Sequence, residues 1–222
     1  MIYRVIENFL PFPYLSRLQN FIHSEHMNYY FMPETVIENP SDHPNRPIKR
    51  RKQTNTNCVE TPQFTSVIYA LHRNGEENKN SAYEQFSPIP VVLETHDIPV
   101  ERIIRMKMNC LLPHVDTHEN SYHTPHPDFL SYRSEFPHGD KSFENYILIF
   151  FPFDTDGFFH IFENRLENNG YEKELVLHKK LKPKENRACI IRSDQFHAGT
   201  NPIEYNARYS FNMVFTSYAN VL

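Results

Sequence analysis

The feature that most limits how this chain can fold is an alternation of apolar and polar side chains that begins near residue 102. In the first such segment the apolar positions are 104, 106, 108 and 110, and the polar ones are Arg105, Lys107 and Asn109. Successive side chains of a strand point to opposite faces, so this segment predicts a half-buried strand. Further strands are expected at 146–151, 158–162, 173–178, 187–192 and 207–215, and Asp156-Gly157 predicts a hairpin turn between the first two.

The first hundred residues have a helical period instead. Apolar residues form one stripe over 14–22, and positions 64, 67, 68 and 71 repeat it after Thr61-Pro62, a pair typical of a helix start. A third short helix is expected from Pro90. Helices followed by many short strands predict an α+β sandwich or barrel, with 1–100 as mainly helical support and 101–218 as the β core. The length of 222 residues favours a single domain, 1–222.

Composition narrows the classes of function. A net charge of −4 argues against a surface built to neutralise phosphates. The basic run Arg46–Lys52 is a local exception; it could contact nucleic acid or an acidic partner, but we favour a solvated loop because no aromatic residues are interleaved. Three cysteines without CxxC spacing, no apolar run of ~20 residues and no signal-peptide centre predict a soluble cytoplasmic protein that does not bind membranes.

His-x-Asp occurs three times, as His114-Val115-Asp116, His126-Pro127-Asp128 and His138-Gly139-Asp140. Two imidazoles and one carboxylate can occupy one face of Fe(II) and leave positions open for a co-substrate and for oxygen. The only histidine after residue 178 is His197, which makes it the natural second imidazole. Roughly half of one His-x-Asp is expected by chance in so histidine-rich a chain, so the tripeptide is a weak signal. The spacing to His197 does not decide among the three pairs.

A series of motifs in a fixed order helps to choose among the three His-x-Asp pairs. It comprises Val5–Pro11, Arg105–Asn109, the H-x-P-H-x-D-aromatic run His123–Phe129, Asp154–Phe158, Asn186-Arg187, and His197 followed eleven residues later by Arg208 and then Ser210-Phe211-Asn212. In this order the chain resembles the Fe(II)/2-oxoglutarate-dependent oxygenases of the prolyl-hydroxylase-like branch, especially small members that phages often encode. It departs from them in a longer segment between Asp128 and Tyr146 and in Phe153, where asparagine is common.

The resemblance implies a double-stranded β-helix, or jelly roll, that holds Fe(II) through His126, Asp128 and His197. His138/Asp140 and His114/Asp116 stay open as alternative ligand pairs. Arg208 would bind the far (C5) carboxylate of 2-oxoglutarate because a guanidinium presents a planar, permanently charged fork. Tyr146 would be a second donor to it or a packing residue. Ser210, Asn212, Lys107 and Asn109 would line the same pocket, whereas His114, His118 and His123 are expected in a mobile rim.

The implied activity is an O2-dependent hydroxylation that releases succinate and CO2. The substrate would be a peptidyl side chain, a small molecule or a nucleobase, and the host cytoplasm would be its location if a phage encodes it. Two alternatives stay open: a jelly-roll enzyme that does not use 2-oxoglutarate, and a metal-free binding or accessory protein. The oligomeric state is not readable from the residues.

Overall fold

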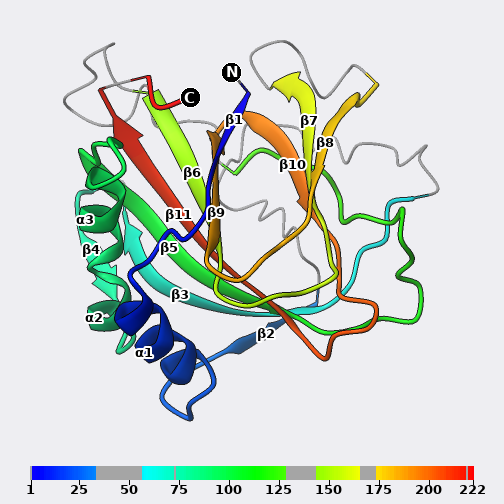
Figure 1. Cartoon of the computed structure of the whole chain (residues 1–222), viewed down its shortest axis with the longest axis horizontal. Coiled ribbons are helices and arrows are strands. Elements are labelled where there is room, and N and C mark those ends of the chain that lie inside the picture. Colours follow the sequence, from blue (N-terminus) through cyan, green and yellow to red (C-terminus); the bar gives the residue numbers. More distant parts are fainter. Residues whose placement is uncertain (1, 34–56, 73, 129–143, 166–173, 219) are drawn as a thin grey trace.

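The computed structural model describes residues 2–33, 57–72, 74–128, 144–165, 174–218 and 220–222. Two antiparallel sheets face each other, and three helices lie against the outer face of the larger one (Figure 1). The larger sheet runs in the order β1 (Tyr3–Ile6), β9 (Arg187–Arg192), β6 (Glu144–Phe151), β11 (Arg208–Ser217), β5 (Arg102–Leu111), β3 (Gln63–Leu71) and β2 (Tyr30–Met32), with β4 (Glu77–Lys79) paired to β3. The smaller sheet runs β10 (Gln195–Gly199), β7 (Phe159–Arg165), β8 (Leu177–Leu181).

The two faces of the larger sheet bury different side chains. On β11, Phe211, Met213 and Phe215 pack toward α1 (Phe12–Ile22), α2 (Tyr83–Phe86) and α3 (Ile89–Glu94) in one core cluster. The alternate residue Val214 packs with Phe159 of the smaller sheet in a second cluster. Because the period along a strand is two, Arg208, Ser210 and Asn212 share the face of Val214 and point into the space between the sheets. This polar end of the interior is where the candidate site lies.

The α+β class with a mainly β core is as predicted, and so is the first helix, whose buried side chains are Tyr14, Leu15, Leu18 and Ile22. The helix expected over 64–71 is wrong, because these residues form β3. The register of β3 against β5 shifts between Val67 and Tyr69, so Ile68 and Tyr69 are both buried. Such a bulge places apolar residues at a spacing that imitates a helix. Within the described part of 1–100, four strands therefore accompany the three helices.

The hairpin expected at Asp156-Gly157 is also wrong. The strands on either side, β6 and β7, belong to different sheets, so this turn carries the chain across the interior. The Asp156 carboxylate accepts hydrogen bonds from the backbone N–H groups of Ile203 (3.0 Å) and Glu204 (2.6 Å). The turn thereby holds the segment between β10 and β11 in place. The strand expected at 173–178 begins only at Leu177, and β10 was not predicted as a strand.

Candidate metal centre

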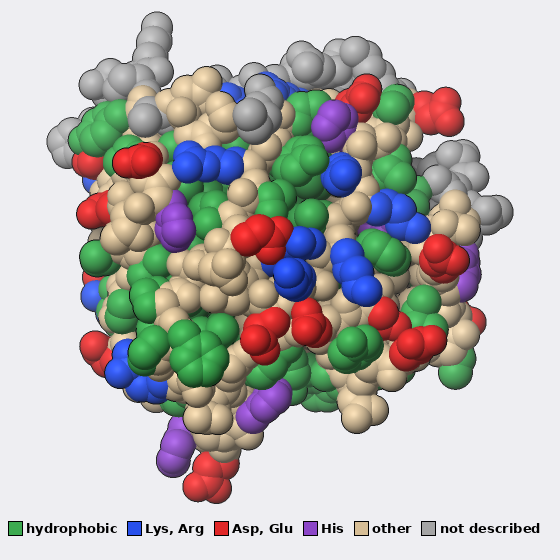
Figure 2. All heavy atoms as spheres, viewed as in Figure 1, with side chains coloured by type: hydrophobic (Ala, Val, Ile, Leu, Met, Phe, Trp, Pro, Cys, Tyr) green, Lys and Arg blue, Asp and Glu red, His purple; other side chains and the backbone are tan. Residues whose placement is uncertain are grey.

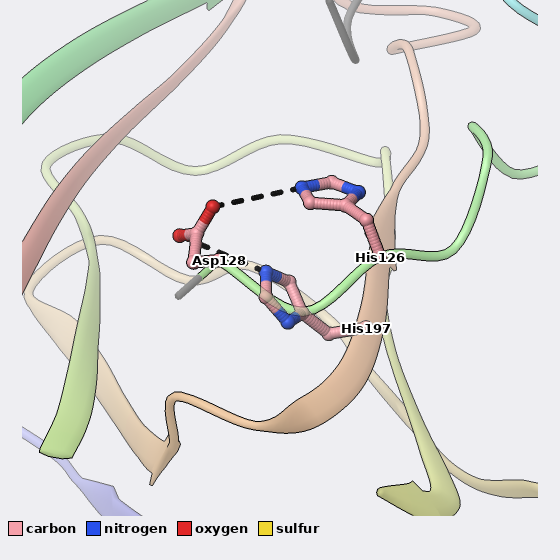
Figure 3. A group of neighbouring side chains, drawn as sticks. All are labelled: His126, Asp128 and His197. Atoms are coloured by element: carbon pink, nitrogen blue, oxygen red, sulfur yellow. Dashed lines mark ion pairs between the residues drawn. The ribbon is translucent and has the colours of Figure 1, made fainter. Parts of the chain in front are cut away.

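Three predicted ligands converge in the structure. His197 lies in the middle of β10, and His126 and Asp128 lie in the segment that follows β5. One ligand atom from each of the three lies within 4.8 Å of the others. The Nε2 atoms of His126 and His197 are 3.7 Å and 3.9 Å from the Asp128 oxygens, and Figure 3 shows both rings turned toward this carboxylate. Among the described residues this is the one such group of His, Cys, Asp and Glu side chains.

Backbone hydrogen bonds fix the geometry of the two imidazoles. The N–H of His126 donates to the carbonyl of His197 (3.0 Å) and the N–H of His197 donates to the carbonyl of His126 (3.1 Å). Each Nδ1 lies beside a further carbonyl oxygen, that of Thr124 (2.9 Å) or Gln195 (3.0 Å). A carbonyl can only accept, so each Nδ1 carries the proton and each Nε2 keeps a free lone pair. This is the tautomer in which a histidine binds a metal through Nε2.

The carboxylate of Asp128 is ionised and incompletely satisfied. Burial alone would raise the pKa of Asp128, but Arg105, whose Nη2 is 3.2 Å from Oδ1, and the neighbouring His197, His126 and Lys107 hold it well below its usual range. Its Oδ2 is buried and has no hydrogen-bond partner in the described part of the chain. Burial lowers the pKa of His197 to about 4, so this ring is neutral at physiological pH. The neutral ring of His197, the imidazole of His126 and an ionised carboxylate with an orphaned oxygen fit a divalent transition metal.

The site is closed on one side and open on the other. The side chains of His197 and Asp128 are 4% and 9% exposed, whereas that of His126 is 27% exposed. The ring of Phe159 lies 5.5 Å from that of His197 on the closed side. Further ligands of a bound metal would therefore enter from the His126 side.

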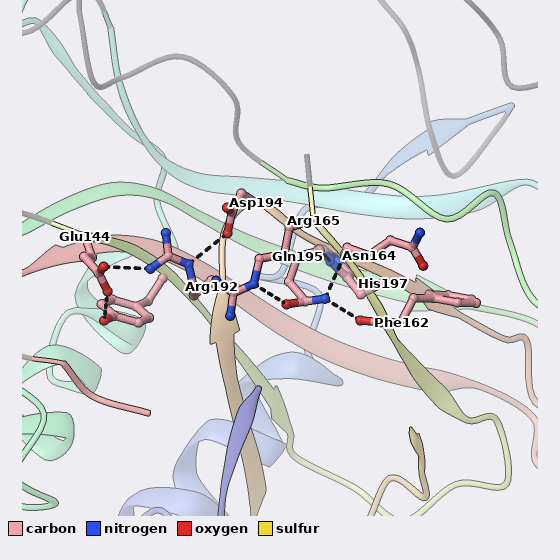
Figure 4. Close-up of polar contacts among 9 residues, drawn as sticks. Glu144, Phe162, Asn164, Arg165, Arg192, Asp194, Gln195 and His197 are labelled. Carbon is pink, nitrogen blue, oxygen red and sulfur yellow. Dashed lines mark hydrogen bonds and ion pairs between the residues drawn. The ribbon is translucent and has the colours of Figure 1, made fainter. Parts of the chain in front are cut away.

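A network that sequence reasoning missed holds His197 in place. The side chain of Gln195 is fully buried; its NH2 group donates to the carbonyls of Phe162 and Asn164, and its oxygen accepts from Arg165 Nε (3.2 Å). Figure 4 shows this amide linking β10 to β7 beside His197. The carbonyl of the same Gln195 faces His197 Nδ1, so the network sets the position of the ring. A glutamine in an otherwise apolar strand, two residues before the histidine, was the available signal.

Arg208 crosses the interior from the larger sheet to the smaller one. It is 3% exposed, its guanidinium carbon lies 5.6 Å from the ring centre of Phe151, and its Nε is buried without a hydrogen-bond partner. Its head packs against Gly199, where a Cβ would come within 2.7 Å of Nη1, and its Cδ would be 2.9 Å from a Cβ on Gly157. No ion pair joins Arg208 to any residue that the structure describes, and burial lowers its pKa to about 10. It is thus a charged guanidinium that has no counter-ion among the described residues.

Tyr146 is not beside Arg208, so the expectation that its hydroxyl binds the same ligand is wrong. Its ring packs 5.9 Å from Phe215, on the helix side of the larger sheet. Its hydroxyl donates to Glu144 Oε2 (2.6 Å). Tyr146 pairs with Phe215 on β11, seven residues from Arg208. Ser210, in contrast, shares the interior face of β11 with Arg208, and its pairing partner on β5 is Asn109.

His114 and His123 lie in described segments, and neither belongs to the group formed by His126, Asp128 and His197. His114 lies 3.6 Å from an Asp116 carboxylate that is 71% exposed, away from the described metal-type group. His123 is buried, not part of a rim: its Nε2 contacts Asn201 and lies 3.2 Å from Thr61 Oγ1. The alternative pair His138/Asp140 lies outside the described residues.

On the face shown in Figure 2, acidic and basic side chains are interspersed without a large field of one sign. None of the described helices is long and apolar enough to span a membrane. The basic run Arg46–Lys52 lies outside the described residues.

Comparison with known proteins identifies the fold. No protein-family model and no curated protein sequence matches the chain. Among solved structures, an oxidoreductase of the 2OG-Fe(II) oxygenase family from Burkholderia pseudomallei aligns with a TM-score of 0.55 at 11% identity, over 98% of this chain and 86% of that one. AviO1 from Streptomyces viridochromogenes aligns at 0.52 and 10% identity, over 97% and 90%.

The α-ketoglutarate-dependent non-heme epimerase SnoN from nogalamycin biosynthesis also aligns at 0.52, with 10% identity over 97% of this chain and 77% of that one. At these identities the likeness concerns the fold. The chain has the jelly-roll fold of the 2OG-Fe(II) oxygenases, as predicted.

Proposed function

We propose that this protein is an Fe(II)- and 2-oxoglutarate-dependent dioxygenase that hydroxylates a peptidyl side chain or a small molecule and releases succinate and CO2. The observation that carries the proposal is the placement of two groups on one short strand. His197, with His126 and Asp128, forms a three-donor group open on one side, and Arg208 packs its uncompensated guanidinium against Gly199, two residues further along β10.

In this proposal His126, Asp128 and His197 hold Fe(II), and Arg208 holds the far carboxylate of 2-oxoglutarate. Two residues of a strand span about 7 Å, a reach suited to a short dicarboxylate with one end at the metal. A guanidinium binds a carboxylate through two parallel charge-assisted hydrogen bonds, and here such a ligand would also supply the missing counter-ion. Iron with 2-oxoglutarate would supply the oxidising chemistry. The protein would bind and orient the reactants and exclude part of the water around them.

Three finer assignments belong to the same proposal. The His123–Phe129 motif and the His197/Arg208 pair support a place in the prolyl-hydroxylase-like branch, near small phage-encoded members. We further propose that residues 1–222 form a single domain. The three cysteines are free thiols, which supports a reducing location such as the cytoplasm.

The decisive experiment is an anaerobic titration of the protein with Fe(II) and then 2-oxoglutarate, followed through the visible charge-transfer band that chelation produces. We expect the band in the unmodified protein and not in His126→Ala, while His114→Ala, a matched control at a half-buried histidine outside the group, should retain it. His138→Ala tests the remaining ligand pair: loss there but not in His126→Ala would overturn the ligand assignment. No band together with no succinate in air would refute the oxygenase, and metal binding without any response to 2-oxoglutarate would favour the 2-oxoglutarate-independent alternative.

A further inference from the structure

Two cationic side chains of β5 face the interior near His126, Asp128 and His197. The function proposed above assigns no ligand to either of them. Lys107 pairs with Asn212 on β11, and Arg105 pairs with Val214, whose side chain belongs to the interior core. The intervening Met106 packs on the opposite, helix side. Arg105 and Lys107 therefore share the interior face of the sheet with Arg208.

Neither cation is fully compensated. Arg105 lies 3.2 Å from Asp128, yet its Nε and Nη2 are buried and make no hydrogen bond to the residues that the structure describes. Lys107 makes no hydrogen bond or ion pair with any part of the chain that the structure describes. Burial lowers the pKa of Lys107 to about 8, which still leaves it protonated at pH 7. Both side chains are half-buried, and holding cations in a partly buried position without a full set of partners favours the binding of an anion.

The balance of charge around His126, Asp128 and His197 also favours an anionic ligand. Among the residues that the structure describes, Asp128 is the one acid that contributes charge here, against the two cations Arg105 and Lys107. A divalent metal adds two positive charges, and the near carboxylate of 2-oxoglutarate removes only one. The far carboxylate does not help, because Arg208 takes it beside Leu111, at the other end of β5. Positive charge therefore stays in excess where the second substrate must enter.

We infer that the prime substrate carries an anionic group, a carboxylate or a phosphate, which Lys107 and Arg105 bind close to the C–H bond that is oxidised. The inference rests on the proposed function and names its substrate class. A row of neutral polar side chains beside Lys107 completes the site: Thr65 donates to Asn109 (3.0 Å), and Asn109 donates to Asn212 (3.5 Å). These amides lie on the interior face next to Lys107 and offer further hydrogen bonds to a bound acid.

The test measures binding rather than turnover. The full chain, loaded with Mn(II) and 2-oxoglutarate without oxygen, is titrated calorimetrically with N-acetyl-aspartic acid α-amide and, separately, with its neutral asparagine counterpart; inorganic phosphate forms a third arm. We expect the acid to bind roughly 10- to 100-fold more tightly than the amide, the range for hydrogen bonds to charged groups. Tighter binding of phosphate than of the acid would identify a phosphate as the anionic group. Lys107→Met should abolish the preference, Lys107→Arg should restore it, and the exposed-site control Lys179→Met should leave it unchanged.

Equal binding of acid and amide by the unmodified protein, or a preference that survives Lys107→Met, would overturn the inference. So would a loss of 2-oxoglutarate affinity in Lys107→Met as large as that in Arg208→Met, because Lys107 would then be a co-substrate ligand. A different failure separates the two proposals. If the unmodified protein binds no 2-oxoglutarate but still prefers the acid in a Lys107-dependent way, the oxygenase assignment fails and the anion site stands.

Discussion

Replacing Arg208 by methionine should make the ligand-free protein more stable and remove its response to 2-oxoglutarate. Burial lowers the pKa of Arg208 to about 10, well below the ordinary value of a guanidinium. One pKa unit corresponds to about 1.4 kcal/mol, so keeping this guanidinium charged costs the fold about 3 kcal/mol. Methionine has a similar unbranched shape but no charge. It loses the contact with the Phe151 ring, worth about 1 kcal/mol, which leaves a gain of about 2 kcal/mol.

The assay is thermal unfolding with Mn(II), with and without 2-oxoglutarate. A gain of about 2 kcal/mol corresponds to roughly 4–8 °C in Tm for a chain of this size. In the unmodified protein, ligand at about 100 times its Kd adds roughly 2.7 kcal/mol, or roughly 5–11 °C. Arg208→Met should show the first shift and not the second. Lys184→Met, which removes a positive charge at an exposed position, should alter neither. A ligand-free variant that is clearly less stable, or one that still responds to 2-oxoglutarate, would refute the reasoning.

Three further outcomes are expected. Gly199→Ala should raise the KM for 2-oxoglutarate but leave metal affinity and Tm nearly unchanged, because its Cβ displaces the flexible head of Arg208; a lower metal affinity would contradict this. Gln195→Met should weaken metal binding roughly 10- to 100-fold, measured with Mn(II), by releasing the carbonyl that orients His197. Burial lowers the pKa of His160 to about 3, so only the unfolded chain takes up its proton below about pH 6.5. His160 alone should therefore lower the free energy of unfolding by about 1.4 kcal/mol for each pH unit of acidification, and His160→Leu should reduce the pH dependence of the urea-unfolding free energy by this amount between about pH 6 and 4.

The local pattern of apolar residues predicted an element correctly where packing in the fold buries those same apolar residues. The stripe over 14–22 forms α1 because one side of it packs on the sheet, and the alternation over 104–110 forms β5 because one face of that strand is apolar. The same reasoning failed at 63–71, where a bulge against β5 changed which residues are buried. It failed again at Asp156-Gly157, because turn chemistry does not reveal whether the next strand pairs with the last one or joins another sheet.

Tyr146 illustrates what a period of two leaves open. The run from 146 to 151 is apolar throughout, so alternation cannot say which residues face the interior. Pairing with β11 settles it: Tyr146 lies opposite Phe215 and packs with the helices, while Ile147 packs between the sheets. A side chain that sequence order places near the site is thereby turned away from it.

The candidate metal centre shows the same division between what the sequence predicts and what only the fold decides. Residue types and their order are a local property of the chain, and they are enough to propose two imidazoles, a carboxylate and an arginine with a compatible chemistry. Which of these groups meet is a long-range property. The pairing of His126 with His197, the anchoring of β10 through Gln195 and the position of Lys107 beside Asp128 join segments that are distant in the chain. The fit of Arg208 against Gly199 joins strands of two different sheets. Such contacts depend on strand register and burial, which act only once the sheets have formed, and they are what makes Arg208 and Lys107 cations in need of a ligand.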